Sequence, residues 1–274
     1  MDQSIPKVAQ IVKHPPKMDL KNKTIILTGA KRIGKTVARF LGERGANLAI
    51  TYRSSKDEAE FMCNECIGAG SKAKAFQADL SSEVDILKLI SAVKKEFGQI
   101  DGLVHMAANY PKTPIESVNM DQFVDTMKII AGSTLLLGSK IGLEMQKNKG
   151  QAVLADGEVT GKIKGKMVFF SDWSILVSPY PDYIIYNGAK AAVDSMVKSF
   201  AKAFGPSITV NAIAPGPILR PPDLTEEEDK EALAGTPLQR WGGTEAVAQA
   251  LITFMENDFL TGVILPVDGG RTVG

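Results

Sequence analysis

The sequence predicts an α/β protein built on a doubly wound parallel sheet of about seven strands, with helices on both faces. From Lys23 onward, short β-branched runs alternate with longer periodic segments, which is the pattern of repeated strand–helix–strand units. Most of these runs are apolar enough to be buried on both faces, as the strands of a parallel sheet are. With 274 residues, 44% of them hydrophobic and 23% charged, the chain can bury a sizeable core.

We expect strands where β-branched and apolar residues gather, at residues 24–28, 47–52, 72–78, 102–107, 166–171, 208–214 and 262–267. Helices are expected to fill the gaps between them. Residues 1–20 lie outside this rhythm and are predicted to form an N-terminal tail. Residues 21–274 are expected to form a single domain, since no linker rich in Pro, Gly and Ser divides them. Near 147–166, Gly and Lys surround short apolar pieces, which predicts a surface β-hairpin.

The overall charge narrows the choice of partners. A formal net charge of +1 leaves no basic surplus for nucleic acid or for a membrane surface, so neither is expected. The N-terminal segment has no continuous apolar stretch like that of a signal peptide, and no window approaches the roughly 18 apolar residues of a spanning helix. We therefore expect a cytoplasmic protein.

The only cysteines, Cys63 and Cys66, form a CxxC motif in the segment FMCNEC. Such a motif occurs in half of a zinc site or in a redox pair. Here no second pair of ligands accompanies it, and the segment reads as the middle of a helix rather than as the end of a strand. We expect two free thiols and no metal.

The segment TIILTGAKRIGKTVARFLGERGANLAITYRSS predicts a strand, a glycine turn, a helix and a second strand. Gly29 permits a tight turn, and Gly34 lets the helix approach the strand or a ligand without a Cβ in the way. The start of the helix then offers free N–H groups and its positive dipole end to a pyrophosphate. For an isolated pair of glycines a plain tight turn is the alternative, but this context favours a Rossmann-type dinucleotide site.

The charges around this turn indicate which dinucleotide is bound. Sites that prefer NAD carry an acidic residue at the end of the second strand, whereas this strand ends in Thr51, Tyr52, Arg53 and Ser54. Arg53, with Lys31 and Arg32 of the turn, could instead clamp a 2′-phosphate. The sequence therefore predicts NADP(H).

A possible catalytic pair lies at the start of a long predicted helix, where Tyr186 and Lys190 are four residues apart and share one face. A tyrosine of pKa ~10 is a poor acid near neutrality, but an adjacent ammonium stabilises the phenolate and lowers that pKa. Alone, the pair is weak evidence, because such pairs occur by chance on many helices.

Several motifs occur together in one order, and they strengthen this interpretation: TGAKRIG, Asp79-Leu80, YNGAK at Tyr186, NAIAPGPI from Asn211, and the ending TPLQRWGGTEAVAQ…FLTGVILPVDGG. From about Leu20 to the C-terminus the chain resembles the short-chain dehydrogenase/reductase family. The resemblance implies an NADP(H)-dependent oxidoreductase that moves a hydride to or from a small-molecule carbonyl or alcohol, with Tyr186 as proton donor. It also implies a homotetramer or homodimer.

The resemblance further implies how the cofactor is held. The glycine turn would bind the pyrophosphate, Asp79 and Leu80 the adenine, and residues after the sixth strand the nicotinamide, while Lys190 would hold the nicotinamide ribose. The stretch near 217–236 would be the substrate-covering loop. The full predicted set is Gly29, Lys31, Arg32, Ile33, Gly34, Arg53, Ser54, Asp79, Leu80, Ala107, Ala108, Tyr186, Lys190, Pro215, Gly216 and Ile218.

The chain departs from the family pattern at three places. The glycine turn is one residue short, so that Arg32 or Ile33 stands where the middle glycine belongs. The catalytic asparagine position falls on Ile130, and His105 replaces the first residue of the family's NNAG. The catalytic serine position falls on Trp173, or on Asp172 if the next loop carries one extra residue.

These departures leave alternatives open. Pteridine reductases of the same family carry an aspartate at the serine position, so Asp172, Tyr186 and Lys190 would form their catalytic set. The substrate would then be a pteridine-like C=N group rather than a ketone. A different class also remains: a cofactor-binding sensor or scaffold that keeps the fold and has lost turnover.

Overall fold

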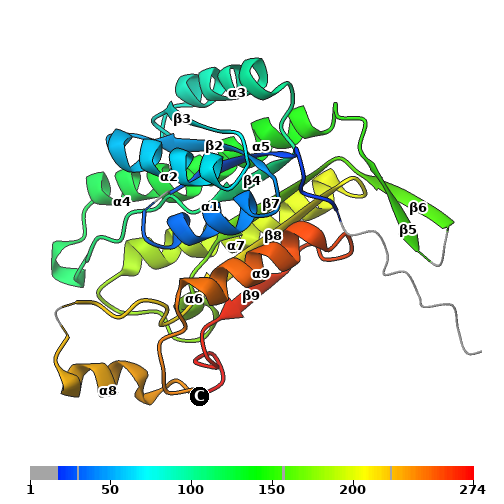
Figure 1. The fold of residues 1–274 in the computed structure, drawn as a ribbon. Helices are drawn as coiled ribbons and strands as arrows, with labels where there is room; N and C mark the ends of the chain where they lie inside the picture. Colours follow the sequence, from blue (N-terminus) through cyan, green and yellow to red (C-terminus); the bar gives the residue numbers. More distant parts are fainter. Residues whose placement is uncertain (1–17, 30, 156–157, 223) are drawn as a thin grey trace, which may run out of the picture.

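The computed structural model describes residues 18–29, 31–155, 158–222 and 224–274 (Figure 1). Its centre is a parallel sheet whose strands lie in the order β3-β2-β1-β4-β7-β8-β9. The strands are β1 (Thr24–Thr28), β2 (Asn47–Tyr52), β3 (Ala73–Gln77), β4 (Gly102–His105), β7 (Gly165–Phe170), β8 (Ile208–Pro215) and β9 (Ile264–Val267). This confirms the predicted seven-stranded α/β fold.

The strand order reverses between β1 and β4, which pair in parallel with Thr28 opposite His105. In open α/β sheets, ligands bind outside the carboxyl ends of the strands at such a switch point. The fourth strand is also shorter than predicted. It ends at His105 because the Thr28 hydroxyl accepts hydrogen bonds from the amides of Met106 and Ala107, which turn the chain out of the sheet.

Two layers of helices cover the sheet (Figure 1). One face packs against α1 (Ile33–Gly42), α2 (Lys56–Gly68) and α9 (Thr244–Glu256). The other packs against α3 (Glu83–Phe97), α5 (Ser133–Met145) and α7 (Ile184–Phe204). Within β1 the side chains alternate, since Ile25 and Leu27 belong to the first layer and Ile26 to the second. Shorter helices lie at the edges: η1 (Ile115–Ser117), α4 (Met120–Met127), the π-helix η2 (Lys128–Gly132), α6 (Trp173–Val177) and α8 (Glu226–Ala234).

The stretch near 147–166 forms the predicted hairpin, in which β5 (Gln151–Ala155) pairs antiparallel with β6 (Glu158–Ile163). It projects from the body of the molecule (Figure 1). Its base is fixed by Asn148, whose side-chain amide donates to the carbonyl oxygens of Ile100 and Lys164.

At the N-terminal end of the described chain, Met18 and Leu20 are buried, and the Met18 amide donates to the Glu256 carbonyl. The rest of the predicted tail, residues 1–17, lies outside the described residues. Across the described parts of the chain, none of the helices is long and apolar enough to cross a membrane.

Both cysteines are free and buried on α2, where the Cys66 thiol donates weakly to the Ala38 carbonyl. Burial raises the pKa of each thiol to about 11, so both stay protonated near neutrality. Among the described residues, no cluster of three His, Cys, Asp or Glu side chains could hold a metal ion.

Candidate active site

A cavity of about 670 Å³ lies at the carboxyl ends of the strands, on the switch point between β1 and β4. Every residue predicted to bind the cofactor lines it except Tyr186 and Lys190, which are buried beside it. The sequence did not point to several other lining residues, which come from loops, from the starts of helices and from the end of β7: Glu58, Met106, Asn109, Ile129, Phe170 and Trp241.

The glycine turn needs both of its glycines. Gly29 has a φ of +76°, and a Cβ there would lie 2.7 Å from the Ala107 amide nitrogen. A Cβ on Gly34 would lie 2.4 Å from the Gly29 carbonyl oxygen, because α1 begins directly against the turn. Arg32 has a φ of +55°, the left-handed region that suits glycine, so it takes the place of the family's middle glycine with a strained backbone.

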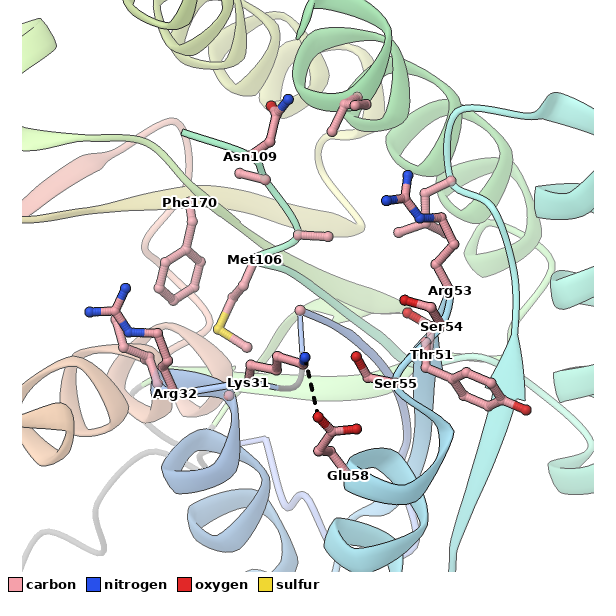
Figure 2. A pocket seen from close by; sticks show the side chains of 18 of the residues that line it. Lys31, Arg32, Thr51, Arg53, Ser54, Ser55, Glu58, Met106, Asn109 and Phe170 are labelled. Carbon is pink, nitrogen blue, oxygen red and sulfur yellow. Dashed lines mark ion pairs between the residues drawn. The ribbon is translucent and has the colours of Figure 1, made fainter. Parts of the chain in front are cut away.

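The three basic residues near the turn do not form one cluster. The Lys31 ammonium pairs with the Glu58 carboxylate at 3.2 Å, in the first turn of α2. In Figure 2, Arg53 and Ser54 lie on one side of Lys31, whereas Arg32 lies on the other side, toward Phe170. Arg32 therefore lies apart from Lys31 and Arg53 on the cavity wall, and Lys31 is already paired with Glu58.

Asp79 follows β3 by two residues and stays ionised near neutrality. Hydrogen bonds from the Ser81 hydroxyl and amide lower the pKa of Asp79, and the charge of Arg53 lowers it further. Leu80 follows it along the cavity wall.

Beside the cavity, the Tyr186 hydroxyl donates to the Asp172 carboxylate at 2.8 Å. The second carboxylate oxygen of Asp172 accepts hydrogen bonds from the Ser174 amide and hydroxyl, so Asp172 caps α6 and is held in place. Of the two positions that the sequence left open, Asp172 and not Trp173 faces the tyrosine.

Lys190 is buried below Tyr186, one turn further along α7. Its ammonium donates to the Phe170 carbonyl at 2.6 Å and lies 5.8 Å from the centre of the Tyr186 ring. Burial lowers the pKa of Lys190 to about 8, against the opposing charges of Asp172 and Asp194.

The pKa of Tyr186 is raised, first by burial and then by the charge and hydrogen bond of Asp172. This is opposite to the direction expected from the lysine alone, because burial and the neighbouring carboxylate outweigh the ammonium. The phenol therefore keeps its proton near neutrality, which is the protonation state that a proton donor needs.

His105 belongs to a directional chain of hydrogen bonds. The Ser133 hydroxyl donates to the Ile129 carbonyl, so it accepts from His105 Nε2, and His105 Nδ1 then accepts from the Thr28 hydroxyl. Burial and the charge of Lys190 lower the pKa of His105 to about 3, which keeps the ring neutral. This chain joins the turn after β4 to η2, where Ile130 is buried and offers no polar side chain.

The stretch 217–236 carries α8 and lines the cavity directly at Ile218 and Leu219, and Trp241 links α8 to the same cavity. The Trp241 ring nitrogen donates to Asp229 of α8 at 2.7 Å, and Arg220 pairs with the same carboxylate at 3.1 Å. Because Trp241 lines the cavity, α8 is tied to the cavity wall.

Comparison with known proteins agrees with this geometry. A family model described as enoyl-(acyl carrier protein) reductase matches residues 29–272. A hydroxynaphthalene reductase-like protein of Metarhizium anisopliae is 27% identical over 270 residues, covering 92% of this chain and 95% of that protein.

Two solved structures are also similar. The short-chain type dehydrogenase/reductase of Mycobacterium ulcerans has a TM-score of 0.82 and 25% identity, covering 93% of this chain and 92% of that one. The FolM alternative dihydrofolate reductase of Brucella canis, solved with NADP, has a TM-score of 0.80 and 26% identity. The match covers 93% of this chain and 96% of that one. The chain belongs to the short-chain dehydrogenase/reductase family of oxidoreductases.

Proposed function

We propose that this chain is an NADP(H)-dependent oxidoreductase acting on a C=O or C=N group of a small molecule, with Tyr186 as the proton donor. The observation that carries the proposal is the 2.8 Å hydrogen bond from Tyr186 to Asp172, with the Lys190 ammonium buried beneath both. A protein that only binds a nucleotide has no need of a phenol held between a carboxylate and an ammonium.

The residues of the cavity suit a phosphorylated dinucleotide. Gly29 and Gly34 leave room against the start of α1, whose free N–H groups favour a pyrophosphate. No acidic residue follows β2, where NAD-preferring sites carry one, and Arg53 stands there instead. The similar Brucella canis protein was solved with NADP, which agrees with this preference.

The proton steps follow from the described side chains. When bound, NADPH supplies the hydride that adds to the substrate carbon. The Tyr186 hydroxyl turns from Asp172 to the substrate and gives its proton to the oxygen or nitrogen of the reacting double bond. The Lys190 ammonium stabilises the resulting phenolate. The Asp172 carboxylate, held by Ser174, then takes a proton from solvent water and passes it to the phenolate, which restores the Tyr186 hydroxyl.

A pterin or dihydrofolate is the second candidate substrate. It is favoured by Asp172 at the position where the resemblance to pteridine reductases places an aspartate, and by the similarity to a dihydrofolate reductase. A ketone substrate remains the first candidate, since the tyrosine and lysine suit either double bond.

NADPH oxidation, followed at 340 nm with ketones, quinones and dihydropterins, tests the proposal against the sensor alternative. We expect turnover with at least one class and tighter binding of NADPH than of NADH. Binding of NADPH with no oxidation across the whole panel would contradict the proposal and favour a sensor.

We further propose that residues 21–274 act as one domain in a cytoplasmic homo-oligomer, and that 217–236 covers the substrate. Large apolar side chains are exposed on α4 and α5, which favours an interface there: Phe123, Val124, Leu135 and Leu143. The mass of the purified protein in solution tests the oligomer.

A further inference from the structure

A group of aromatic side chains adjoins Tyr186, the proposed proton donor. The Tyr110 ring stacks on the Tyr183 ring, with centroids 4.1 Å apart and an interplanar angle of 14°. It makes a T-shaped contact with the Tyr186 ring, with centroids 4.6 Å apart and an interplanar angle of 85°. Tyr180 and Trp173 extend this group, with ring separations of 6.2 Å between Tyr180 and Tyr183 and 5.9 Å between Tyr180 and Trp173. We call Tyr110 and Tyr183 the stacked pair.

The stacked pair is held by the backbone. The Thr113 amide donates to the Asp182 carbonyl at 2.6 Å, and Thr113 and Tyr183 form an isolated parallel β-bridge. Thr113 is 1% exposed, so this link is well covered. It fixes the loop after β4 against the start of α7 and so fixes Tyr110 over Tyr186.

The exposures show which ring a substrate meets. Tyr186 is only 6% exposed, whereas Tyr110 is 51% exposed. Because the two ring centroids are only 4.6 Å apart, a substrate at the Tyr186 hydroxyl comes close to the more exposed Tyr110 ring. The hydroxyl of Tyr110 is close to Tyr183 and Asp172, which together with burial raise its pKa, so it is a neutral phenol.

We propose that the stacked pair selects substrates whose reacting C=O or C=N is conjugated with a planar ring. A flat ring fits parallel to Tyr110 and replaces the water on its exposed face, and aromatic rings prefer such offset or edgewise contacts. A saturated ring of the same size is puckered and cannot make this contact. The inference rests on the proposed function and names its substrate class.

Two ketones of similar size test the selection, α-tetralone with an aromatic ring and 1-decalone with saturated rings. We expect the wild-type protein to prefer α-tetralone. Tyr110→Leu should lower kcat/KM for α-tetralone by about tenfold, mainly through KM, and that for 1-decalone by less than about twofold. Tyr110→Phe keeps the ring and should keep the preference for α-tetralone. Phe259→Leu, which removes an exposed ring three residues after α9, is the matched control.

A binding measurement separates this inference from the proposed function. Fluorescence titration of 2-naphthol into the NADP-loaded protein should show a dissociation constant raised by about tenfold in Tyr110→Leu, with NADP binding unchanged. Three results would overturn the inference while leaving hydride transfer standing. They are an equal loss of kcat/KM for both ketones in Tyr110→Leu, a wild-type preference for 1-decalone, and an unchanged dissociation constant for 2-naphthol. Absence of turnover with every ketone, quinone and dihydropterin would overturn the proposed function as well.

Discussion

The Tyr186 hydroxyl donates a hydrogen bond of 2.8 Å to Asp172, which is one of the two residues on which the family's serine position could fall. A serine can both donate to and accept from the phenol, whereas an ionised carboxylate only accepts. The negative charge also raises the pKa of Tyr186. The pair therefore keeps Tyr186 protonated, the state from which it can give a proton during reduction.

Replacing Asp172 by Asn should lower the pKa of Tyr186, because the negative charge is removed while the shape is kept. Alcohol oxidation, which needs the phenolate, should then begin at lower pH than in the wild type. Reduction near neutrality should fall by about tenfold or more, since the relay group is lost. Full pH–rate profiles in both directions check this. An Asp172→Ala protein with wild-type turnover would contradict the role of Asp172.

Lys190 should set the alkaline limit of reduction. Its pKa is about 8 in the folded protein, so the ammonium that stabilises the phenolate is lost as the pH rises through this value. The lowered pKa also means that the folded state binds this proton less tightly than the unfolded state. As the pH rises from 8 to the pKa of lysine in the unfolded chain, near 10.4, Lys190 should therefore increase the free energy of unfolding.

Lys190→Met tests both effects. We expect turnover to fall by about 100-fold and the free energy of unfolding at pH 7 to be equal to or above that of the wild type. Urea denaturation at pH 7 and pH 10 measures the second effect. A variant that is far less stable at pH 7 would show that the ammonium is mainly structural.

His105 should couple acid stability to the cofactor site. Its pKa is lowered from 6.5 to about 3, so its contribution to stability is present above pH 6.5 and is lost as the pH falls toward 3. His105→Asn should be less stable at pH 7.5 but should lose less stability between pH 6.5 and 4. Its NADPH affinity should also fall, because the hydrogen bonds between Thr28 and Ser133 are broken.

Glu58 and Arg53 should affect the choice of cofactor in opposite directions. Arg53→Ala should weaken NADPH binding by about tenfold and NADH binding little, because only NADPH carries the 2′-phosphate. Glu58→Gln frees Lys31 and should strengthen NADPH binding by about two- to threefold, a small effect since the pair is exposed. Glu60→Gln, on the same helix and paired with Lys56, is the control. Equal effects on both dinucleotides would show that neither residue reads the phosphate.

The sheet could be predicted from the sequence because buried parallel strands are short apolar runs, and β1 and β2 match their predicted ranges residue for residue. The glycine turn and the Tyr186–Lys190 pair were also found, since both depend on local spacing. Asp172 could be reached only by allowing one extra loop residue, and the structure decides between it and Trp173.

Contacts between distant segments could not be predicted. His105 bonds Thr28 and Ser133, which are 77 and 28 residues away, and nothing in the sequence pairs them. Arg32 and Lys31 are neighbours in sequence, yet only the backbone conformation at Arg32 shows that they point to different sides. The raised pKa of Tyr186 depends on burial, which is a property of the folded chain.

The proposed function depends most on Tyr186 giving its proton to the reacting double bond. Tyr186→Phe keeps the ring and removes the hydroxyl, and its NADPH affinity and its NADPH oxidation with the best carbonyl or imine substrate should be measured together. We predict unchanged affinity and a loss of turnover of about 100-fold or more. Turnover within a few-fold of the wild type, at the same NADPH affinity, would contradict the account.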